Sequence, residues 1–317
     1  MSTGSVTRSQ PMASGELPVM KSSPGYLIRR AQQVHVSLWQ KHVKQNLTSV
    51  QYGVLLVLGQ WHGIDQSSVA ELMSLDKNTA ADVLRRLRDR AIVARERDPA
   101  DGRRWLAELT DEGMSMLLQA GPAVLEVQDR MVDPLSTDEA ETLLHLLRAM
   151  VYRSDPADVA PGAAPGKTAP DWPPRLAALQ LHTAPGHLIR RAQQLHTSLW
   201  TEEVSAILTS VQYSVLLVLH RESPMDQSAL GRHAHLDKAT GTDVVSRMHD
   251  RGLIHRVRDE IDGRRYRLSL SAKGLKVLRS HADGVRTVQR RLVEPLSRIE
   301  RRKFVSLMTK VVNAAEE

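Results

Sequence analysis

The sequence predicts a mainly helical protein with small β hairpins, an α+β chain built from two copies of one domain. Residues 75–104 combine a short amphipathic helix, strand-like alternation and a glycine at a turn, and residues 236–265 repeat this pattern. The turn Asp101-Gly102-Arg103-Arg104 returns unchanged, 161 positions later, as Asp262-Gly263-Arg264-Arg265. We therefore expect two matching units that bind one target.

Composition narrows the class of protein. The chain has 317 residues, 41% of them hydrophobic, a formal net charge of +7 and a pI near 9.8. This excess of Arg and Lys favours a polyanionic partner, although solvated helix faces are the alternative. Without cysteine, thiol chemistry is excluded. The start of the chain lacks the apolar core of a signal peptide, and no apolar run approaches the roughly 20 residues of a membrane span. We expect a soluble cytoplasmic protein.

The repeat sets the domain boundaries. Pro24 aligns with Pro185, and the alignment continues without a gap to Val151 and Val312. We predict a disordered N-terminal arm at 1–23, a first unit at 24–153, a Pro/Ala-rich linker at 154–184 and a second unit at 185–314. A short functional arm is the alternative for the first segment. Within the linker, residues 175–182 are expected to add one or two helical turns.

Local signals place the helices of each unit. A wide apolar stripe predicts a buried helix from Gly25. Thr48 and Gln51, like Ser136 and Glu139, have the spacing of a capping box, and both boxes recur in the second unit. The apolar run at 54–58 should lie at the centre of the domain. A long helix is expected to begin after Thr110 and to end before residue 134.

Residues 65–109 have the pattern of a winged helix. Two short helices are separated by a turn, and Asp76 is placed to cap the second. That helix should bury Ala80, Val83, Leu84 and Leu87 and expose Lys77, Asn78, Arg85, Arg86 and Arg88. Strand-like residues 92–97 and 105–109 flank a turn with glycine, as in a hairpin. A helix-turn-helix followed by a hairpin makes a winged helix.

At this point each unit resembles the MarR family of bacterial transcription regulators, over residues 24–152 and 185–313. The hairpin and next helix, DPADGRRWLAELTDEG, resemble the family's D-P-x-D-x-R-x-x-x-L-x-L-T-x-x-G, whereas DEIDGRRYRLSLSAKG departs at Pro and at Thr. Both copies have Gly102 or Gly263 where many members carry Arg. Arg103 and Arg264 are then expected to enter the minor groove, with Asp101 and Asp262 as salt-bridge partners.

The resemblance implies a dimer whose first and last helices interlock. One chain supplies both halves here, so we expect two winged helices joined by an all-helical pseudo-dimer domain, with the linker keeping one half close to the other. Pairing between chains is the alternative.

Residue types on the exposed faces suggest the contacts with double-stranded DNA. The candidates are Ser67, Lys77, Asn78, Thr79, Arg85, Asp101, Arg103 and Arg104 in the first unit, and Ser228, Lys238, Thr240, Thr242, Arg247, Asp262, Arg264 and Arg265 in the second. Asp82 and Asp243 either accept from cytosine or orient a neighbouring arginine. The units differ at Asn78 and Ala239, at Ala81 and Thr242, and at Arg85 and Ser246. An imperfect palindrome is therefore expected as the operator.

A small-molecule sensor is the second expectation. The opening helices look most like those of family members that regulate breakdown of aromatic acids. A pocket for an aromatic acid or phenol could be lined by Arg29, Arg30, His35, Trp39 and Tyr52, and by Arg190, Arg191, His196, Trp200 and Tyr213. Plain core packing is the alternative for His35 and Trp39.

We expect a repressor rather than an enzyme, with no cofactor and no metal. The sequence has no Gly-rich phosphate loop and no nucleophile elbow. His233 and His235 form the only close histidine pair and lack evident further ligands. The alternative is a degenerate winged-helix protein that acts in protein interaction or DNA architecture, without a ligand.

Overall fold

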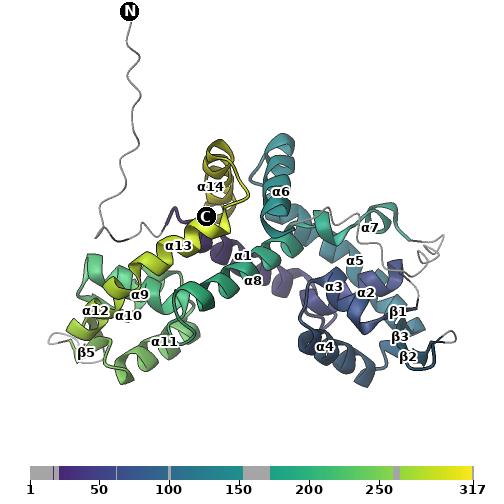
Figure 1. The fold of residues 1–317 in the computed structure, drawn as a ribbon, viewed down its shortest axis with the longest axis horizontal. Coiled ribbons are helices and arrows are strands. Elements are labelled where there is room, and N and C mark those ends of the chain that lie inside the picture. Colours follow the sequence, from purple (N-terminus) through teal and green to yellow (C-terminus); the bar gives the residue numbers. More distant parts are fainter. Residues whose placement is uncertain are drawn as a thin grey trace, which may run out of the picture. The chain divides into compact units, whose positions relative to one another are not determined.

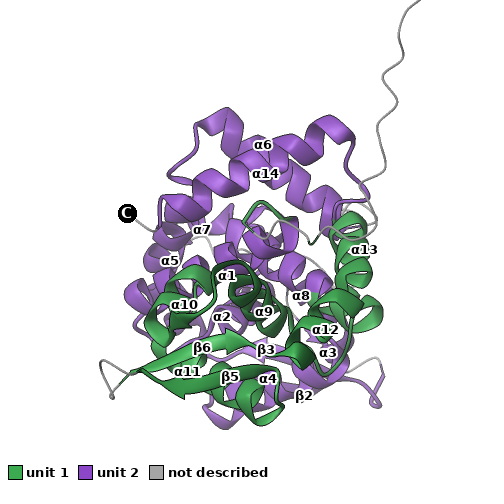
Figure 2. Ribbon diagram, turned by 90° about the vertical axis from the view of Figure 1, so that its left-hand side faces the viewer, with its two compact units in different colours: residues 1–23, 197–292 green, residues 24–196, 293–317 purple. Residues whose placement is uncertain are grey.

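The computed structural model describes residues 17, 21–61, 63–98, 101–152, 172–259 and 265–315. Nearly all of the expected N-terminal arm, and the linker up to residue 171, lie outside these ranges. The chain divides into two compact units, coloured separately in Figure 2. The larger unit holds residues 24–196 and 293–317, and the smaller holds 1–23 and 197–292.

The larger unit contains the whole first copy (Figure 1). Its elements are α1 (Pro24–His42), α2 (Ser49–Gln60), β1 (Ile64–Asp65), α3 (Gln66–Met73), α4 (Lys77–Asp89), β2 (Val93–Arg97), β3 (Trp105–Leu109), α5 (Asp111–Val132) and α6 (Thr137–Val151). The described part of the linker adds α7 (Pro174–Ala177) and the 3-10 turn η2 (Leu181–Thr183), which confirms the helical turns expected there. From the second copy come most of α8 (Pro185–Glu203) and all of α14 (Arg298–Asn313).

The helix starts follow the predicted caps. At the start of α2, the Gln51 amide donates to Thr48 Oγ1 at 3.1 Å and the Thr48 amide donates to Gln51 Oε1 at 2.9 Å. Ser136 and Glu139 make the same reciprocal pair at α6. Because each box satisfies two amides that the helix leaves unpaired, it fixes where the helix begins.

The hairpin forms a three-stranded antiparallel sheet in the order β1-β3-β2. Val93 pairs with Leu109 and Arg97 with Trp105, so the strands of the predicted hairpin are in register along their whole length. β1 is too short to give a period in the sequence, and it adds Ile64 to the sheet opposite Ala107. This third strand ties the wing to the start of α3.

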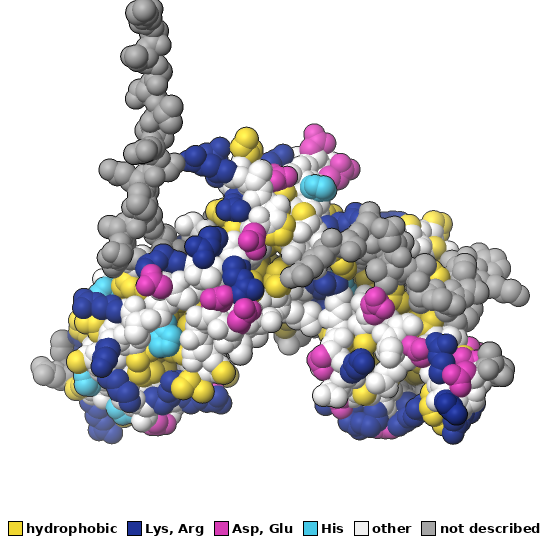
Figure 3. Space-filling model, viewed as in Figure 1, with side chains coloured by type: hydrophobic (Ala, Val, Ile, Leu, Met, Phe, Trp, Pro, Cys, Tyr) yellow, Lys and Arg dark blue, Asp and Glu magenta, His cyan; other side chains and the backbone are white. Residues whose placement is uncertain are grey.

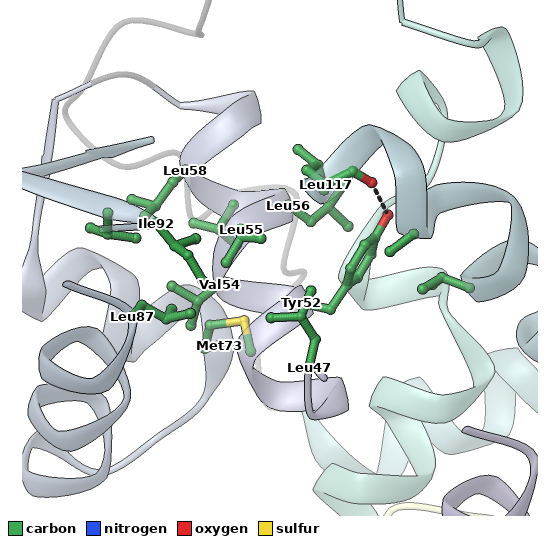
Figure 4. Packing of buried hydrophobic residues seen from close by; sticks show 14 of the residues in the cluster. Leu47, Tyr52, Val54, Leu55, Leu56, Leu58, Met73, Leu87, Ile92 and Leu117 are labelled. Carbon is green, nitrogen blue, oxygen red and sulfur yellow. Dashed lines mark hydrogen bonds between the residues drawn. The ribbon is translucent and has the colours of Figure 1, made fainter. Parts of the chain in front are cut away.

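The core of the first copy surrounds α2. Residues Val54 to Leu58 are buried, as predicted from their apolar run, and Figure 4 shows α2 side chains between Leu87, Ile92 and Leu117. Burial of one such side chain contributes about 1.5–3 kcal/mol. Of the four α4 residues predicted to be buried, Ala80 and Leu87 are buried, whereas Val83 and Leu84 are half-buried at the edge of the core.

The smaller unit contains the second winged helix. Its elements are α9 (Ser210–Glu222), β4 (Met225–Asp226), α10 (Gln227–Ala234), α11 (Lys238–Asp250), β5 (Ile254–Arg258), β6 (Tyr266–Leu270), α12 (Ala272–Ser280) and α13 (Ala282–Leu292). The sheet order β4-β6-β5 repeats that of the first copy. Thr209 and Gln212 form the expected capping box at α9.

The long helix differs between the copies. α5 continues through Pro122, whereas its counterpart divides at His281 into α12 and α13. There the imidazole Nδ1 of His281 donates to the Val277 carbonyl at 2.8 Å. The same carbonyl still accepts from the His281 amide, at 3.3 Å, so the side chain competes with a long helical hydrogen bond where the helix divides.

In the larger unit, α14 of the second copy packs against α1 and α6 of the first (Figure 2). Lys310 Nζ lies 2.5 Å from Glu139 Oε1, and Lys303 Nζ donates to Thr142 Oγ1 at 3.2 Å. α6 has three acidic residues and one basic, a net charge of −2, whereas α14 has five basic and one acidic, a net charge of +4. The two helices are therefore complementary in charge.

Candidate DNA interface and ligand pocket

The N-terminus of α4 is shaped by its cap. The Asp76 carboxylate accepts from the amides of Asn78 and Thr79 at 3.0 and 2.9 Å, and from the Thr79 hydroxyl at 2.5 Å. The Thr79 hydroxyl bond, with these amides, lowers the pKa of Asp76. Thr240 binds Asp237 in the same way at α11. Both threonine hydroxyls are thus engaged in capping, while Lys77 and Asn78 remain exposed on the first turn.

The arginines of α4 are oriented by acidic neighbours. Arg85 Nη2 lies 2.5 Å from Asp82, which also binds Arg86 Nε at 2.8 Å. In α11, Arg247 Nε lies 2.9 Å from Asp243. Of the two alternatives for Asp82 and Asp243, the structure therefore favours the one in which each aspartate orients a neighbouring arginine.

The two winged helices carry their positive charge on different elements. α4 has four basic and two acidic residues, but α11 has two of each. In contrast, β5 and β6 hold three arginines and no acidic residue, whereas two arginines and two glutamates balance in β2 and β3. On the face seen in Figure 3, dark blue side chains gather over the lower edge of each winged helix.

Stacked arginines were missed by the sequence reasoning. The guanidinium carbons of Arg95 and Arg97 each lie 4.3 Å from the centre of the Trp105 ring. Arg256 lies 3.8 Å from the Tyr266 ring at the matching position of the second copy. The alternation of Arg95 and Arg97 on one strand face, with an aromatic residue opposite, was the signal that could have revealed them.

The turn of the first wing corrects one expectation. Asp101 Oδ1 accepts from the backbone amide of Arg103 at 3.0 Å, so it shapes the turn instead of pairing with the Arg103 guanidinium. Arg103 is exposed. Arg104 joins the wing to α3, with Nη2 2.5 Å from Asp65 Oδ2 and Nη1 3.8 Å from Asp98. The hydrogen bond from Arg104 helps to hold the pKa of Asp65 below its usual value.

The remaining DNA candidates are placed as follows. Ser67 and Ser228 are exposed on α3 and α10, Lys238 is exposed at the start of α11, and Thr242 accepts from Gln227 Nε2 at 2.8 Å. Arg265 is exposed just before β6. Asp262 and Arg264 lie outside the described residues.

Four of the predicted ligand residues meet in the larger unit. His35, Trp39, Tyr52 and Arg190 line one cavity of about 40 Å³, together with backbone and side chains from α2, α5 and the linker. The rings of His35 and Trp39 are 5.9 Å apart, and those of Trp39 and Tyr52 are 6.0 Å apart. Sequence reasoning missed His187, Gln128 and Met73, which also line this cavity.

Trp39 and Tyr52 are held by the backbone. Trp39 Nε1 donates to the Leu47 carbonyl at 2.6 Å, and the Tyr52 hydroxyl donates to the Leu117 carbonyl at 3.5 Å (Figure 4). Trp200 and Tyr213 repeat this in the second copy, donating to Leu208 and Leu278. Since their polar ends are satisfied, these four rings serve as apolar walls and packing.

The adjacent arginines of α8 point to different places. Arg190 Nη2 donates to the Met73 carbonyl at 2.6 Å. Arg191 instead donates to Ser74 and to Val151, and it stacks on Tyr152 at 4.0 Å. Arg191 therefore does not line the His35 cavity, because one step along a helix turns a side chain by about 100°, and it lines a second cavity beside Ser74, Val151 and Tyr152 instead. Arg30 does not line this cavity either, and it binds Gln33.

Burial controls the charges of the ligand candidates. Desolvation, with the nearby charge of Arg190, lowers the pKa of His35 to about 4. Desolvation, with the charge of Arg29, lowers the pKa of His196 to about 4. Both imidazoles are thus neutral near pH 7. Burial lowers the pKa of Arg29 and of Arg190 to about 10, so both guanidiniums remain charged.

Arg29 is the least satisfied of these groups. Its side chain is 7% exposed, and neither Nη1 nor Nη2 has a hydrogen-bond partner among the residues that the structure describes. Its described contact is with the Tyr26 ring at 5.4 Å. A buried cation without acceptors costs several kcal/mol unless an anion joins it, so this position can bind a carboxylate.

Across the described ranges, no three or more His, Cys, Asp or Glu side chains gather as a metal ion would require. His233 binds Glu222, with Nδ1 2.9 Å from Oε2. No helix in the described part of the chain is long and apolar enough to cross a membrane.

The fold and the positive charge of both winged helices define a regulator with two winged-helix DNA-binding domains. Residues 47–105 and 208–266 match the MarR family. The chain is 34% identical over 132 residues to transcriptional regulator HosA of Escherichia coli O111:H-, and this alignment covers 42% of the chain and 97% of HosA. The chain belongs to the MarR family, as two units in tandem.

Other relatives are also regulators. The chain is 29% identical over 128 residues to the transcriptional repressor NicR of Pseudomonas putida, which covers 40% of this chain and 81% of NicR. The chain is also similar to the PcaV regulator from Streptomyces coelicolor, whose crystal structure was solved with its natural ligand. The two sequences are 42% identical over 44% of this chain and 98% of PcaV, and the two structures superpose with a TM-score of 0.42. Both relatives are named as transcription regulators.

Proposed function

We propose that the chain is a repressor whose two winged helices bind one imperfect palindrome and which a small aromatic acid releases from DNA. α4 and α11 are the reading helices, and the exposed Lys77, Asn78 and Lys238 are the first side chains to meet DNA. The named repressor activity of NicR, a relative by sequence, supports repression over activation.

The asymmetry of the operator follows from the distribution of charge. The first copy would neutralise phosphates mainly through α4, and the second mainly through β5 and β6. Asn78, which can bond adenine edges, has Ala239 as its counterpart. Two half-sites with different base preferences therefore suit this chain better than a perfect palindrome.

A single chain is proposed to supply both halves. α6 and α14 are opposite in charge and joined by Lys310 and Glu139. Pairing two first copies from separate chains would place two acidic α6 helices together, and pairing two second copies would do the same with the basic α14. Like charges in contact disfavour both symmetric alternatives.

The ligand part of the proposal rests on Arg29. A buried, charged guanidinium with no acceptor is suited to a carboxylate, which can take two hydrogen bonds from it at once. Neutral His196, whose pKa Arg29 helps to lower, can hydrogen-bond a phenol or carboxylate.

The test begins with a selection of bound sequences from a random DNA pool, followed by fluorescence anisotropy on the selected duplex. Titration with 4-hydroxybenzoate and related acids should weaken DNA binding about 5- to 150-fold, the usual range of such coupling. Arg29→Met should abolish the response, while Arg30→Met, which removes the same charge nearby, should keep it. Lack of response to every acid would contradict the sensor. Failure to select any sequence would favour an architectural protein instead.

A further inference from the structure

The linker segment Trp172–Thr183 packs onto the first copy. Trp172 is 6% exposed and Leu176 is fully buried, both in the core around α2. Arg175 Nη2 lies 2.8 Å from both oxygens of Asp129, and Gln60 Nε2 donates to the Leu179 carbonyl at 2.8 Å. The segment is therefore fixed along its length by apolar and polar contacts.

Two glycines make room for this segment. A Cβ at Gly59 would lie 2.8 Å from the Trp172 ring, and a Cβ at Gly121 would lie 2.8 Å from Leu176 Cδ2. The equivalent positions of the second copy, 161 residues later, are His220 and Ala282. Asp129 likewise becomes Arg290. The residues that accommodate the segment in the first copy are thus replaced by larger or oppositely charged residues in the second copy.

The end of the segment fills the pocket. Leu179 and Leu181 line the cavity that also contains His35, Trp39 and Arg190. Its remaining volume is about 40 Å³. A cavity that binds benzene measures about 150 Å³, so an aromatic ring cannot enter while these leucines are in place.

The two buried arginines, Arg190 and Arg29, also differ in their hydrogen-bond acceptors. Arg190 binds the Met73 carbonyl at 2.6 Å, Gln194 Oε1 at 3.0 Å and His187 Nδ1 at 3.3 Å. Arg29, its counterpart, has no acceptor for Nη1 or Nη2 within the described residues. The guanidinium beside the filled cavity is satisfied by protein acceptors, whereas Nη1 and Nη2 of Arg29 are left to donate to another acceptor.

We infer that the linker segment closes the ligand pocket of Arg190 from within the chain, so that one aromatic carboxylate binds per chain, at Arg29. This inference rests on the proposed function for the identity of the ligand, but the closure of the Arg190 pocket does not. Duplication has thereby produced one receptive site and one site occupied by the protein itself.

Thiol labelling tests the closure without any ligand. The chain has no cysteine, so Val124→Cys places a single thiol in the wall of the cavity. Its reaction with N-ethylmaleimide should be slow and should accelerate at least about tenfold when Trp172→Ala and Leu176→Ala release the segment. Gly121→Ala, which installs the residue of the second copy, is a milder release. Val285→Cys, the equivalent thiol of the second copy, should not respond to either change.

Calorimetry with 4-hydroxybenzoate tests the stoichiometry. Wild type should bind one molecule per chain, Arg29→Met none, and the Trp172→Ala/Leu176→Ala variant two. Two equal sites in wild type, or an unchanged Val124→Cys rate after release, would overturn the inference. Absence of binding in every variant would refute the aromatic-acid proposal and the stoichiometry with it, while the thiol rates would still decide whether the segment closes the cavity.

Discussion

Neutral, buried His35 and His196 make the fold sensitive to acid. Each has a pKa of about 4 in the folded protein, chiefly because burial disfavours the imidazolium, against 6.5 for an ordinary histidine. Between these values the unfolded chain binds more protons than the folded one. The stability that each histidine provides is therefore complete above pH 6.5 and is lost as the pH falls toward 4.

The magnitude follows from the size of the shift. A difference of about 2.5 pKa units corresponds to about 3 kcal/mol for each histidine, of which about 2 kcal/mol is lost by pH 5. Two histidines together should thus lower the free energy of unfolding by about 4 kcal/mol between pH 8 and pH 5. That is a large part of the stability of an ordinary domain.

The assay is guanidinium chloride unfolding followed by circular dichroism from pH 8 to pH 5. Wild type should lose stability across this range, while the His35→Gln/His196→Gln double variant should lose about 4 kcal/mol less. The comparison uses the slope with pH, so any loss of packing in the variant cancels. Burial also lowers the pKa of His187, which leaves a residual slope. Equal slopes in wild type and double variant would refute the reasoning.

Three further outcomes are expected. Lys77→Ala should weaken binding to all DNA sequences alike and reduce the slope of log affinity against log salt by about 0.9, as measured by anisotropy; loss of sequence preference instead would indicate a base contact. Trp105→Ala removes the ring on which Arg95 and Arg97 stack, and it should lower the affinity for DNA about 5- to 30-fold without changing thermal unfolding. An unchanged affinity would show that the two stacked arginines do not contribute to DNA binding. Glu139→Lys should lower the midpoint of thermal unfolding, because it removes both the pair with Lys310 and the cap of α6, and Lys310→Glu added to it should recover the part due to the pair; no recovery at all would contradict the pairing.

The features that the sequence predicted well depend on neighbours within a few residues. Thr48 and Gln51 cap α2 through groups three residues apart, and Asp76 caps α4 in the same way. The hairpin turn around Gly102 is equally local. Because such bonds form inside one turn, residue type and spacing were sufficient to place them.

The features that the sequence did not predict join distant parts of the chain. Arg104 meets Asp65 across 39 positions, and Gln60 meets the Leu179 carbonyl across 119. The repeat pointed to Arg190 as the counterpart of Arg29, and four of the ligand candidates line one cavity, but their role in binding stays a prediction. Which of the neighbouring arginines faces the His35 cavity depends on the rotation of α8 against α3, which no local pattern encodes.

The contact of α14 with α1 and α6 bears on how such a regulator would respond to its own abundance. A regulator assembled from separate subunits falls apart on dilution, and its occupancy of DNA then declines more steeply than its concentration. Here the second copy's last helix reaches the first copy's helices within one covalent chain. Operator occupancy is therefore expected to fall only in proportion to the number of chains, so that the response to a falling protein concentration would be gradual and not steep.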